Sequence, residues 1–245
     1  MDEQIRPVAI VTGAGSGIGR AIALALGRSG FGLVLVGRRP EPLAETDEEL
    51  PEGVESISVP LDVSDPASGE AMVAAAVAKF GRVDVLVNNA GYAPMAAIDE
   101  TEAGAIQRAY MTNAVGPACA IAAAWRAFRT QREEGVAWRL GPCIVNISTM
   151  GTADPFAGFF AYASSKIPVN LMAKICATEG KPLDIRAFAI APGAVETRML
   201  RSLFTTDVVP RERCLTPQRV AEEVLACVLG ERAPRNGETI MMPGP

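Results

Sequence analysis

Short apolar runs and helix-like segments alternate along the whole chain, and this alternation constrains the fold more than any other feature. The apolar runs predict strands over residues 8–12, 31–36, 54–60, 83–87, 143–147, 185–191 and 239–242. Helices are predicted over residues 20–28, 69–80, 101–132 and 217–229, with a further one around Tyr162. Because strands separated by helices pair in parallel through right-handed crossovers, we expect one α/β domain with a doubly wound sheet over residues 1–245.

The composition excludes several classes of site and partner. The 245 residues include no histidine, which rules out Ser-His and Cys-His nucleophiles and most zinc sites, so no metal site is expected. A net charge of −5 at pH 7 gives no electrostatic footprint for nucleic acid or an anionic membrane. No stretch approaches the ~18 uninterrupted apolar residues of a membrane span. We therefore expect neither a nucleic-acid nor a membrane partner.

The five cysteines are odd in number, widely scattered and without a Cys-x-x-Cys pair. This pattern is typical of buried thiols in a reducing compartment rather than of disulfides or a metal site. Residues 1–4 lead directly into the first predicted strand without a basic n-region, so we expect no signal peptide. The expected location is the cytoplasm.

The turn after the first predicted strand, residues 12–20, is rich in glycine. Its glycines do not follow the G-x-G-x-x-G spacing but fit T-G-x-x-x-G-x-G, with Gly13, Gly17 and Gly19. Such a turn lets the backbone approach a pyrophosphate at the N-terminus of the next helix, where free amides and the helix dipole favour anions. Its position after the first strand of an alternating pattern favours a dinucleotide site over a merely structural tight turn.

Tyr162 and Lys166 are four residues apart in a predicted helix, so they share one face. A free tyrosine has a pKa near 10, too high for proton exchange at neutral pH. A positive charge within about 4–6 Å favours the phenolate and lowers the pKa of the phenol. The pair therefore predicts a general acid/base. Its spacing alone is also compatible with coincidence.

Several further motifs occur in a fixed order, and together with these two features they resemble the short-chain dehydrogenase/reductase family over essentially the whole chain. The motifs are residues 12–19, 62–63, 88–91, 113, 148–149, the pair Tyr162 and Lys166, and residues 192–197. The resemblance implies a Rossmann-type sheet of seven mainly parallel strands with helices on both faces. It also implies an NAD(P)-dependent oxidoreductase that interconverts CH–OH and C=O groups.

By this resemblance, the cofactor lies along the ends of the strands. Asp62 and Val63 flank the adenine, residues 89–91 line the path to the nicotinamide ribose, and Val195 and Thr197 contact the carboxamide. The implied cofactor-binding residues are Gly13, Gly15, Ser16, Gly17, Ile18, Gly19, Arg38, Arg39, Asp62, Val63, Asn89, Ala90, Gly91, Tyr162, Lys166, Pro192, Gly193, Val195 and Thr197.

The preference between the two cofactors depends on the end of the second predicted strand. Arg38 and Arg39 stand where NAD-selective relatives carry an acidic residue, and two guanidinium groups suit the 2′-phosphate of NADP. Against this, Ser16 stands where NADP-selective relatives often carry a basic residue, and the carboxylate of Glu41 is an alternative acceptor for a ribose hydroxyl. Arg38 and Arg39 are also compatible with a solvated loop in which they bind no cofactor. NADP is the expected cofactor, with NAD as the alternative.

The catalytic residues implied by the resemblance are Asn113, Thr149, Tyr162 and Lys166. Tyr162 exchanges the hydroxyl proton, Lys166 lowers the Tyr162 pKa and binds the nicotinamide ribose, and Asn113 holds a water of a proton relay. Thr149 occupies the position thirteen residues before the tyrosine, where the family usually has serine, and is expected to polarise the substrate oxygen. Ser148 is expected to point away, because neighbouring strand residues face opposite sides.

The expected substrate is a mostly apolar carbonyl or alcohol of medium size. A mobile lid is predicted over about residues 196–216, because this segment is long and irregular.

Pro168 is expected to loosen or kink the Tyr162 helix. The resemblance implies a homodimer or homotetramer formed through the helices after the fourth and fifth strands. Expected substrate contacts are residues 92–94, 150–152, 156 and 159–160.

Two other functions fit parts of this sequence. A catalytically silent NAD(P)-binding regulator would share the fold, but the intact Tyr162, Lys166 and Asn113 favour an enzyme. The sugar-nucleotide epimerase and dehydratase branch uses T-G-x-x-G-x-x-G in longer chains with a substrate domain, and neither feature occurs in this sequence.

Overall fold

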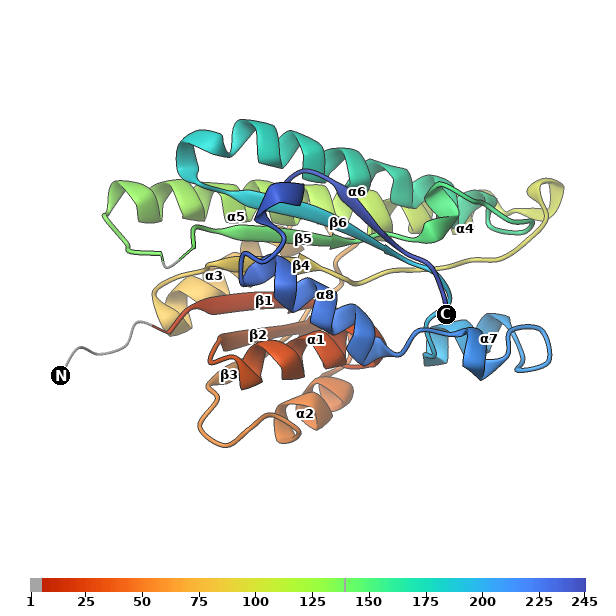
Figure 1. Ribbon diagram of the computed structural model, residues 1–245, viewed down its shortest axis with the longest axis horizontal. Coiled ribbons are helices and arrows are strands. Elements are labelled where there is room, and N and C mark those ends of the chain that lie inside the picture. Colours follow the sequence, from red (N-terminus) through yellow and green to blue (C-terminus); the bar gives the residue numbers. More distant parts are fainter. Residues whose placement is uncertain (1–5, 139) are drawn as a thin grey trace.

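The computed structural model describes residues 6–138 and 140–245, so the expectation drawn from residues 1–4 lies outside the described part. Its strands form one sheet in the order β3-β2-β1-β4-β5-β6-β7, and every neighbouring pair is parallel (Figure 1). The strands are β1 Val8–Thr12, β2 Gly32–Gly37, β3 Ser56–Pro60, β4 Val85–Asn88, β5 Cys143–Ile147, β6 Arg186–Pro192 and β7 Thr239–Met242. The predicted fold class is confirmed.

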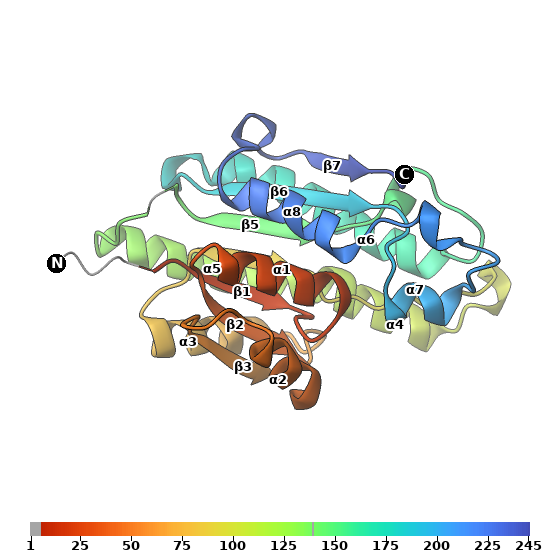
Figure 2. The same cartoon turned by 60° about the horizontal axis from the view of Figure 1, so that its bottom comes forward.

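The sheet separates two apolar clusters, because successive strand residues point to opposite faces. Ala9 and Val11 of β1 pack with α1 and α8, whereas Val8 and Ile10 pack with α3, α5 and α6. Figure 2 shows α1 and α8 crossing the front of the sheet. The helices are α1 Gly17–Arg28, α2 Pro40–Glu48, α3 Ser68–Phe80, α4 Ala103–Tyr110, α5 Gly116–Glu133, α6 Phe160–Glu179, α7 Arg198–Leu203 and α8 Pro217–Val228. Coverage of both faces accounts for the nearly continuous apolar sequence of the strands.

Helix α2, like the short helix α7, is an element that the sequence pattern did not predict. Only Leu43 and Thr46 of its nine residues are buried, so the segment carries almost no apolar periodicity. Pro40 occupies its first turn, where the missing N–H costs no hydrogen bond. The helix follows directly on Arg39 and therefore positions the end of β2.

The single helix predicted over residues 101–132 is divided in the structure. A π-helical turn, Met111–Val115, lies between α4 and α5. At the start of α5, a Cβ on Gly116 would lie 2.2 Å from the Val63 carbonyl oxygen, so the helix approaches this loop as only glycine allows. Single π turns inside helices are frequent at functional sites, and this one carries Asn113.

Helix α6 continues without interruption through Pro168, so the expected loosening does not end the helix. The neighbouring Ile167 is 53% exposed, which places this part of α6 at the outer surface. None of the described helices is both long enough and apolar enough to cross a membrane. The segment predicted as an irregular lid contains α7 and a short 3₁₀ turn at Arg211–Arg213.

Candidate active site

A cavity of about 770 Å³ lies at the carboxyl ends of the strands. It opens beside β1 and β4, the neighbouring strands at which the order of the sheet reverses direction, and ligands of doubly wound sheets bind at this point. All the residues that the sequence assigned to the cofactor line this cavity except Gly19, which lies in α1 behind the turn. Of the four predicted catalytic residues, Thr149, Tyr162 and Lys166 line it and Asn113 lies behind the wall.

The Gly-rich turn forms one wall of the cavity, which it lines with residues 13 and 15–18. Gly13 and Gly17 have φ angles of +67° and +55°, which favour glycine. A Cβ on Gly19 would lie 2.1 Å from the Gly13 carbonyl oxygen and 2.5 Å from Asn89 Nδ2. Ser16 is the N-cap of α1, yet its side chain makes no capping hydrogen bond. The first amides of α1 are thus presented to the cavity without a side-chain partner, an arrangement that suits an anion.

Thr12 and Asn89 fasten this turn to the end of β4. The Thr12 hydroxyl accepts hydrogen bonds from the backbone N–H groups of Asn89 at 3.0 Å and Ala90 at 3.1 Å. In return, Asn89 Nδ2 donates to the Thr12 carbonyl oxygen at 2.8 Å. Asn88, the other asparagine of the pair, lies outside the cavity lining and donates instead to Asn146 Oδ1 at 2.9 Å. It therefore holds neighbouring strands together.

Arg38 and Arg39 follow β2, are exposed and line the cavity. After the neighbouring strand β3, backbone and side-chain hydrogen bonds from Ser64 lower the pKa of the Asp62 carboxyl, and the positive charge of Arg38 contributes to the same shift. Glu41, which the sequence offered as a ribose ligand, is not among the described residues that line the cavity. The geometry at the end of β2 thus presents guanidinium groups rather than a carboxylate.

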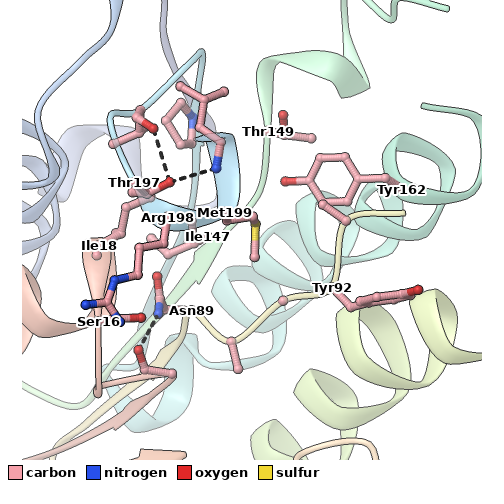
Figure 3. Close-up of a pocket in the computed structure, with 18 of the residues that line it drawn as sticks. Ser16, Ile18, Asn89, Tyr92, Ile147, Thr149, Tyr162, Thr197, Arg198 and Met199 are labelled. Carbon is pink, nitrogen blue, oxygen red and sulfur yellow. Dashed lines mark hydrogen bonds between the residues drawn. The ribbon is translucent and has the colours of Figure 1, made fainter. Parts of the chain in front are cut away.

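Tyr162 and Thr149 face each other across the inner part of the cavity (Figure 3). Burial raises the pKa of the Tyr162 phenol above its usual value, and the neighbouring Thr149 hydroxyl partly offsets this rise. The Thr149 hydroxyl also accepts a hydrogen bond from the Gly151 backbone N–H at 3.2 Å, which fixes its orientation. Ser148, which was expected to point away, also lines the cavity; it is 2% exposed, and its hydroxyl has no hydrogen-bond partner in the described structure.

Lys166 lies one turn further along α6 and is 3% exposed. Its ammonium donates a hydrogen bond to the Ile147 carbonyl oxygen at 2.7 Å, and burial lowers its pKa to about 8. We expected Lys166 to lower the pKa of Tyr162, but in this arrangement burial of the phenol dominates. The physical reason is that the ammonium is drawn to the end of β5 instead of to the phenol oxygen.

Asn113 is fully buried in the π-helical turn and uses its side chain to hold the segment after β4. Its Oδ1 accepts a hydrogen bond from the Tyr92 N–H at 2.9 Å, and its Nδ2 donates to the Tyr92 carbonyl at 2.8 Å and to Ser165 Oγ at 2.9 Å. A Cβ on Gly91 would lie 3.3 Å from Asn113 Oδ1 and 3.5 Å from Lys166 Nζ. Asn113 therefore joins the segment after β4, the π turn and α6 directly behind the lysine.

A family model described as short chain dehydrogenase matches residues 7–207 of this chain. The chain belongs to the short-chain dehydrogenase family. It is similar to the versicolorin reductase of Emericella nidulans, at 30% identity over 217 residues that cover 88% of this chain and 78% of that protein. As expected from the sequence, it is an oxidoreductase.

Two solved structures show the same fold over nearly the whole length. The actinorhodin polyketide ketoreductase, determined as a variant with NADPH, has a TM-score of 0.88 and 32% identity, with 100% of this chain and 98% of that chain covered. A 3-ketoacyl-(acyl-carrier-protein) reductase from Brucella melitensis, complexed with NADH, has a TM-score of 0.86 and 28% identity, with 96% of both chains covered. The expected cofactor class, NAD(P), is the one bound in these two relatives.

The outer part of the cavity of this short-chain dehydrogenase is aromatic. The Phe159 ring lies 5.2 Å from Tyr162, 4.5 Å from Phe156 and 6.0 Å from Phe204, measured between ring centroids. Phe204 comes from the end of α7, so the lid segment contributes to the same cluster. Phe160, which the sequence also offered, is 47% exposed and does not line the cavity among the described residues.

The two ends of the segment predicted as a lid, residues 196–216, are joined to each other in this short-chain dehydrogenase. Val195 and Leu215 form a parallel bridge, in which the Leu215 N–H donates to the Ala194 carbonyl at 2.8 Å and the Glu196 N–H donates to the Leu215 carbonyl at 2.9 Å. Within the loop, Arg201 donates to the Glu196 carboxylate and, at 2.8 Å, to the Val209 carbonyl. Residues 196–214 thus form a compact loop braced by one arginine.

Two arginines in the cavity were missed by the sequence reasoning. Arg198, in the first turn of α7, and Arg108, whose guanidinium lies 4.4 Å from the Tyr92 ring centroid, both line it. Arg198 directly follows Thr197, which was assigned to the cofactor, and this position next to a predicted site residue was the available signal. No local pattern indicated Arg108, because α4 reaches the cavity only through tertiary packing. In the described residues, no group of three or more His, Cys, Asp or Glu side chains is placed to hold a metal ion.

Proposed function

We propose that this short-chain dehydrogenase interconverts an alcohol and a ketone with NADP(H), and that Tyr162 is the general acid/base. The observation that carries the proposal is the Tyr162 phenol beside the Thr149 hydroxyl, in the same cavity as the Gly-rich turn. NAD(H) is the alternative cofactor. The relatives named above, a versicolorin reductase and two ketoreductases, support the reaction class.

The Gly-rich turn fits a dinucleotide, since Gly19 and Gly13 leave no space for a Cβ between the turn and Asn89. The free amides at the start of α1 would hold the diphosphate, and Arg38 with Arg39 would hold the 2′-phosphate of NADP. The position of Glu41 outside the cavity supports NADP over NAD. When bound, the nicotinamide cofactor supplies or accepts the hydride.

The chain itself supplies the proton and the hydrogen bond to the substrate oxygen. In the direction of reduction, Tyr162 donates its proton to that oxygen, while Thr149 donates a hydrogen bond to it. Burial raises the pKa of the phenol, which favours the protonated form from which Tyr162 would donate. In the direction of oxidation, the phenolate is needed, and a positive Lys166 close to the ring would favour it.

The aromatic cluster of Phe156, Phe159 and Phe204 supports an apolar substrate, because rings at these centroid distances offer a wall without hydrogen-bonding groups. A ketone carried on a flat or aromatic body fits this wall best. The lid segment then covers the substrate and excludes water from the reacting atoms.

A panel of aliphatic, alicyclic and aromatic ketones with NADPH and with NADH, followed by absorbance of the reduced nicotinamide, tests the proposal. We expect turnover of aromatic or bicyclic ketones with NADPH, and none in the Tyr162→Phe variant. A protein that binds NADPH in calorimetry but reduces no ketone of the panel would support the alternative, a catalytically silent cofactor-binding regulator.

For the assembly, we propose a homodimer or homotetramer formed through α5 and α6. Ile167, Leu171 and Ile175 are 53%, 58% and 45% exposed, and their spacing of four residues places them in one stripe along α6. Helices α5 and α6 lie along the same face of the sheet (Figure 1). We further propose one domain over residues 1–245, and a cytoplasmic location supported by five free cysteines.

A further inference from the structure

Arg198 lies where the lid segment meets the Gly-rich turn. The residue before it, Thr197, packs against that turn, since a Cβ on Gly17 would lie 3.1 Å from Thr197 Cγ2. From the start of α7 the Arg198 side chain extends past Ile18 toward Ser16, and all three residues line the same cavity (Figure 3). The Arg198 guanidinium therefore faces the part of the cavity that the N-terminus of α1 lines.

The charges around this position leave Arg198 available to an anion. Arg20 and Arg201, its neighbours in space or sequence, are paired with Glu45 and Glu196. No carboxylate of the described residues lies within 4.0 Å of the Arg198 guanidinium. The hydrogen bond from Arg20 lowers the pKa of the exposed Glu45 carboxyl, and the positive charges of Arg198 and Arg39 contribute to the same shift.

We propose that Arg198 binds a phosphate group of the dinucleotide from the lid side, and that this contact couples cofactor binding to closure of the lid. The inference rests on the proposed function, because it requires a bound dinucleotide. Arg198 is a positioning residue: it touches the cofactor away from the reacting atoms, and it tethers α7. The same short helix carries Met199, Leu200 and Leu203 into the cavity, so fixing its first residue orders the wall that the substrate meets.

Calorimetric titration of NADPH and NADH into the parent protein and Arg198→Ala tests the contact. We expect the variant to raise the Kd for NADPH about ten- to a hundredfold, the range for one charge-assisted hydrogen bond. Equal weakening of both cofactors would assign Arg198 to the diphosphate, and selective weakening of NADPH would assign it to the 2′-phosphate; both support the proposal. Arg198→Lys, which keeps the charge, should recover part of the affinity.

Arg213→Ala is the matched control, because it removes the same charge from an exposed site of the same segment outside the cavity lining. An equal loss of affinity in this control would overturn the proposal, since it would show a general effect of charge. An unchanged Kd in Arg198→Ala for both cofactors would also overturn it.

Hydrogen exchange reports the coupling independently of activity. In the parent, NADPH should slow amide exchange both in the Gly-rich turn and over residues 198–209. In Arg198→Ala at saturating NADPH, protection should persist in the turn and be lost from the lid segment; retained lid protection would overturn the coupling. A parent that binds neither cofactor would overturn the proposed function together with this inference, whereas tight binding in parent and variant alike would overturn this inference alone.

Discussion

The Lys166 ammonium donates a hydrogen bond to the Ile147 carbonyl oxygen at 2.7 Å and so lies at the end of β5. Burial lowers the pKa of this ammonium to about 8 and raises the pKa of the Tyr162 phenol. Burial thus disfavours the charged form of both groups, which lie one helical turn apart on α6.

Lys166 should make the stability of the protein rise with pH between about 8 and 10.5. In this range the unfolded chain, with a lysine pKa near 10.5, binds more protons than the folded protein, whose pKa is about 8, so the free energy of unfolding increases as pH rises. Urea denaturation of the parent and Lys166→Met across this range measures the effect. The free energy of unfolding of Lys166→Met should exceed that of the parent most near pH 7, and this excess should shrink as pH rises. An excess that does not change with pH would contradict a lowered pKa of Lys166 in the folded protein.

Tyr162→Phe should abolish turnover while leaving the Kd for the cofactor nearly unchanged, because only the oxygen that exchanges the proton is lost. General acid/base catalysis contributes roughly 10²–10⁴-fold, so steady-state kinetics should show a loss of kcat of that size. Retention of more than about a tenth of kcat would mean that another group serves as the acid. Lys166→Ala should lower both cofactor affinity and kcat, since two roles are assigned to it.

Arg38→Asp should narrow or reverse a preference for NADPH. The guanidinium is replaced by a carboxylate that repels the 2′-phosphate and accepts a hydrogen bond from a ribose hydroxyl. The loss of one charge-assisted hydrogen bond changes affinity roughly ten- to a hundredfold. Dissociation constants for both cofactors in parent and variant measure the change. Equal constants in the parent protein would refute the NADP assignment.

Thr149→Val should lower kcat/KM by roughly 10²-fold or more, because it keeps the shape of the side chain but removes one donor to the substrate oxygen. Thr149→Ser should remain active. Ser148→Ala is the matched control. It should change kcat/KM only slightly, since the Ser148 hydroxyl has no hydrogen-bond partner to lose in the described structure. If Ser148→Ala cripples the enzyme while Thr149→Val is tolerated, the roles of the two hydroxyls are reversed.

Leu171→Glu should convert the proposed oligomer to monomers, because it places a charge in the middle of the exposed stripe on α6. Light scattering after size-exclusion chromatography gives the mass directly. Val77→Glu is the control, as Val77 is 43% exposed on α3 and lies outside the stripe. A monomeric parent protein would contradict the assembly.

The sequence predicted the sheet well, because buried parallel strands are continuous apolar runs and the Gly-rich turn marks the end of the first one. It failed where tertiary contacts rather than periodicity set the conformation. Helix α2 buries too few residues to leave a pattern, and the π turn before Gly116 depends on a close approach to Val63. In the site, the family resemblance paired Tyr162 with Thr149, but the hydrogen-bond partner of the Lys166 ammonium depends on where β5 ends and cannot be read from the sequence.

The bridge between Val195 and Leu215 gives the lid segment a fixed base, which bears on how enzymes of this kind diversify. Because the ends of the loop are joined independently of its tip, residues can be inserted or exchanged near Asp207 and Val208, both exposed, with only a small entropic cost for the longer loop. Such a change would leave the positions of the sheet and of the proton-transfer groups unaltered. Substrate range can therefore change, in evolution or in the laboratory, through residues that lie outside the sheet and away from the proton-transfer groups.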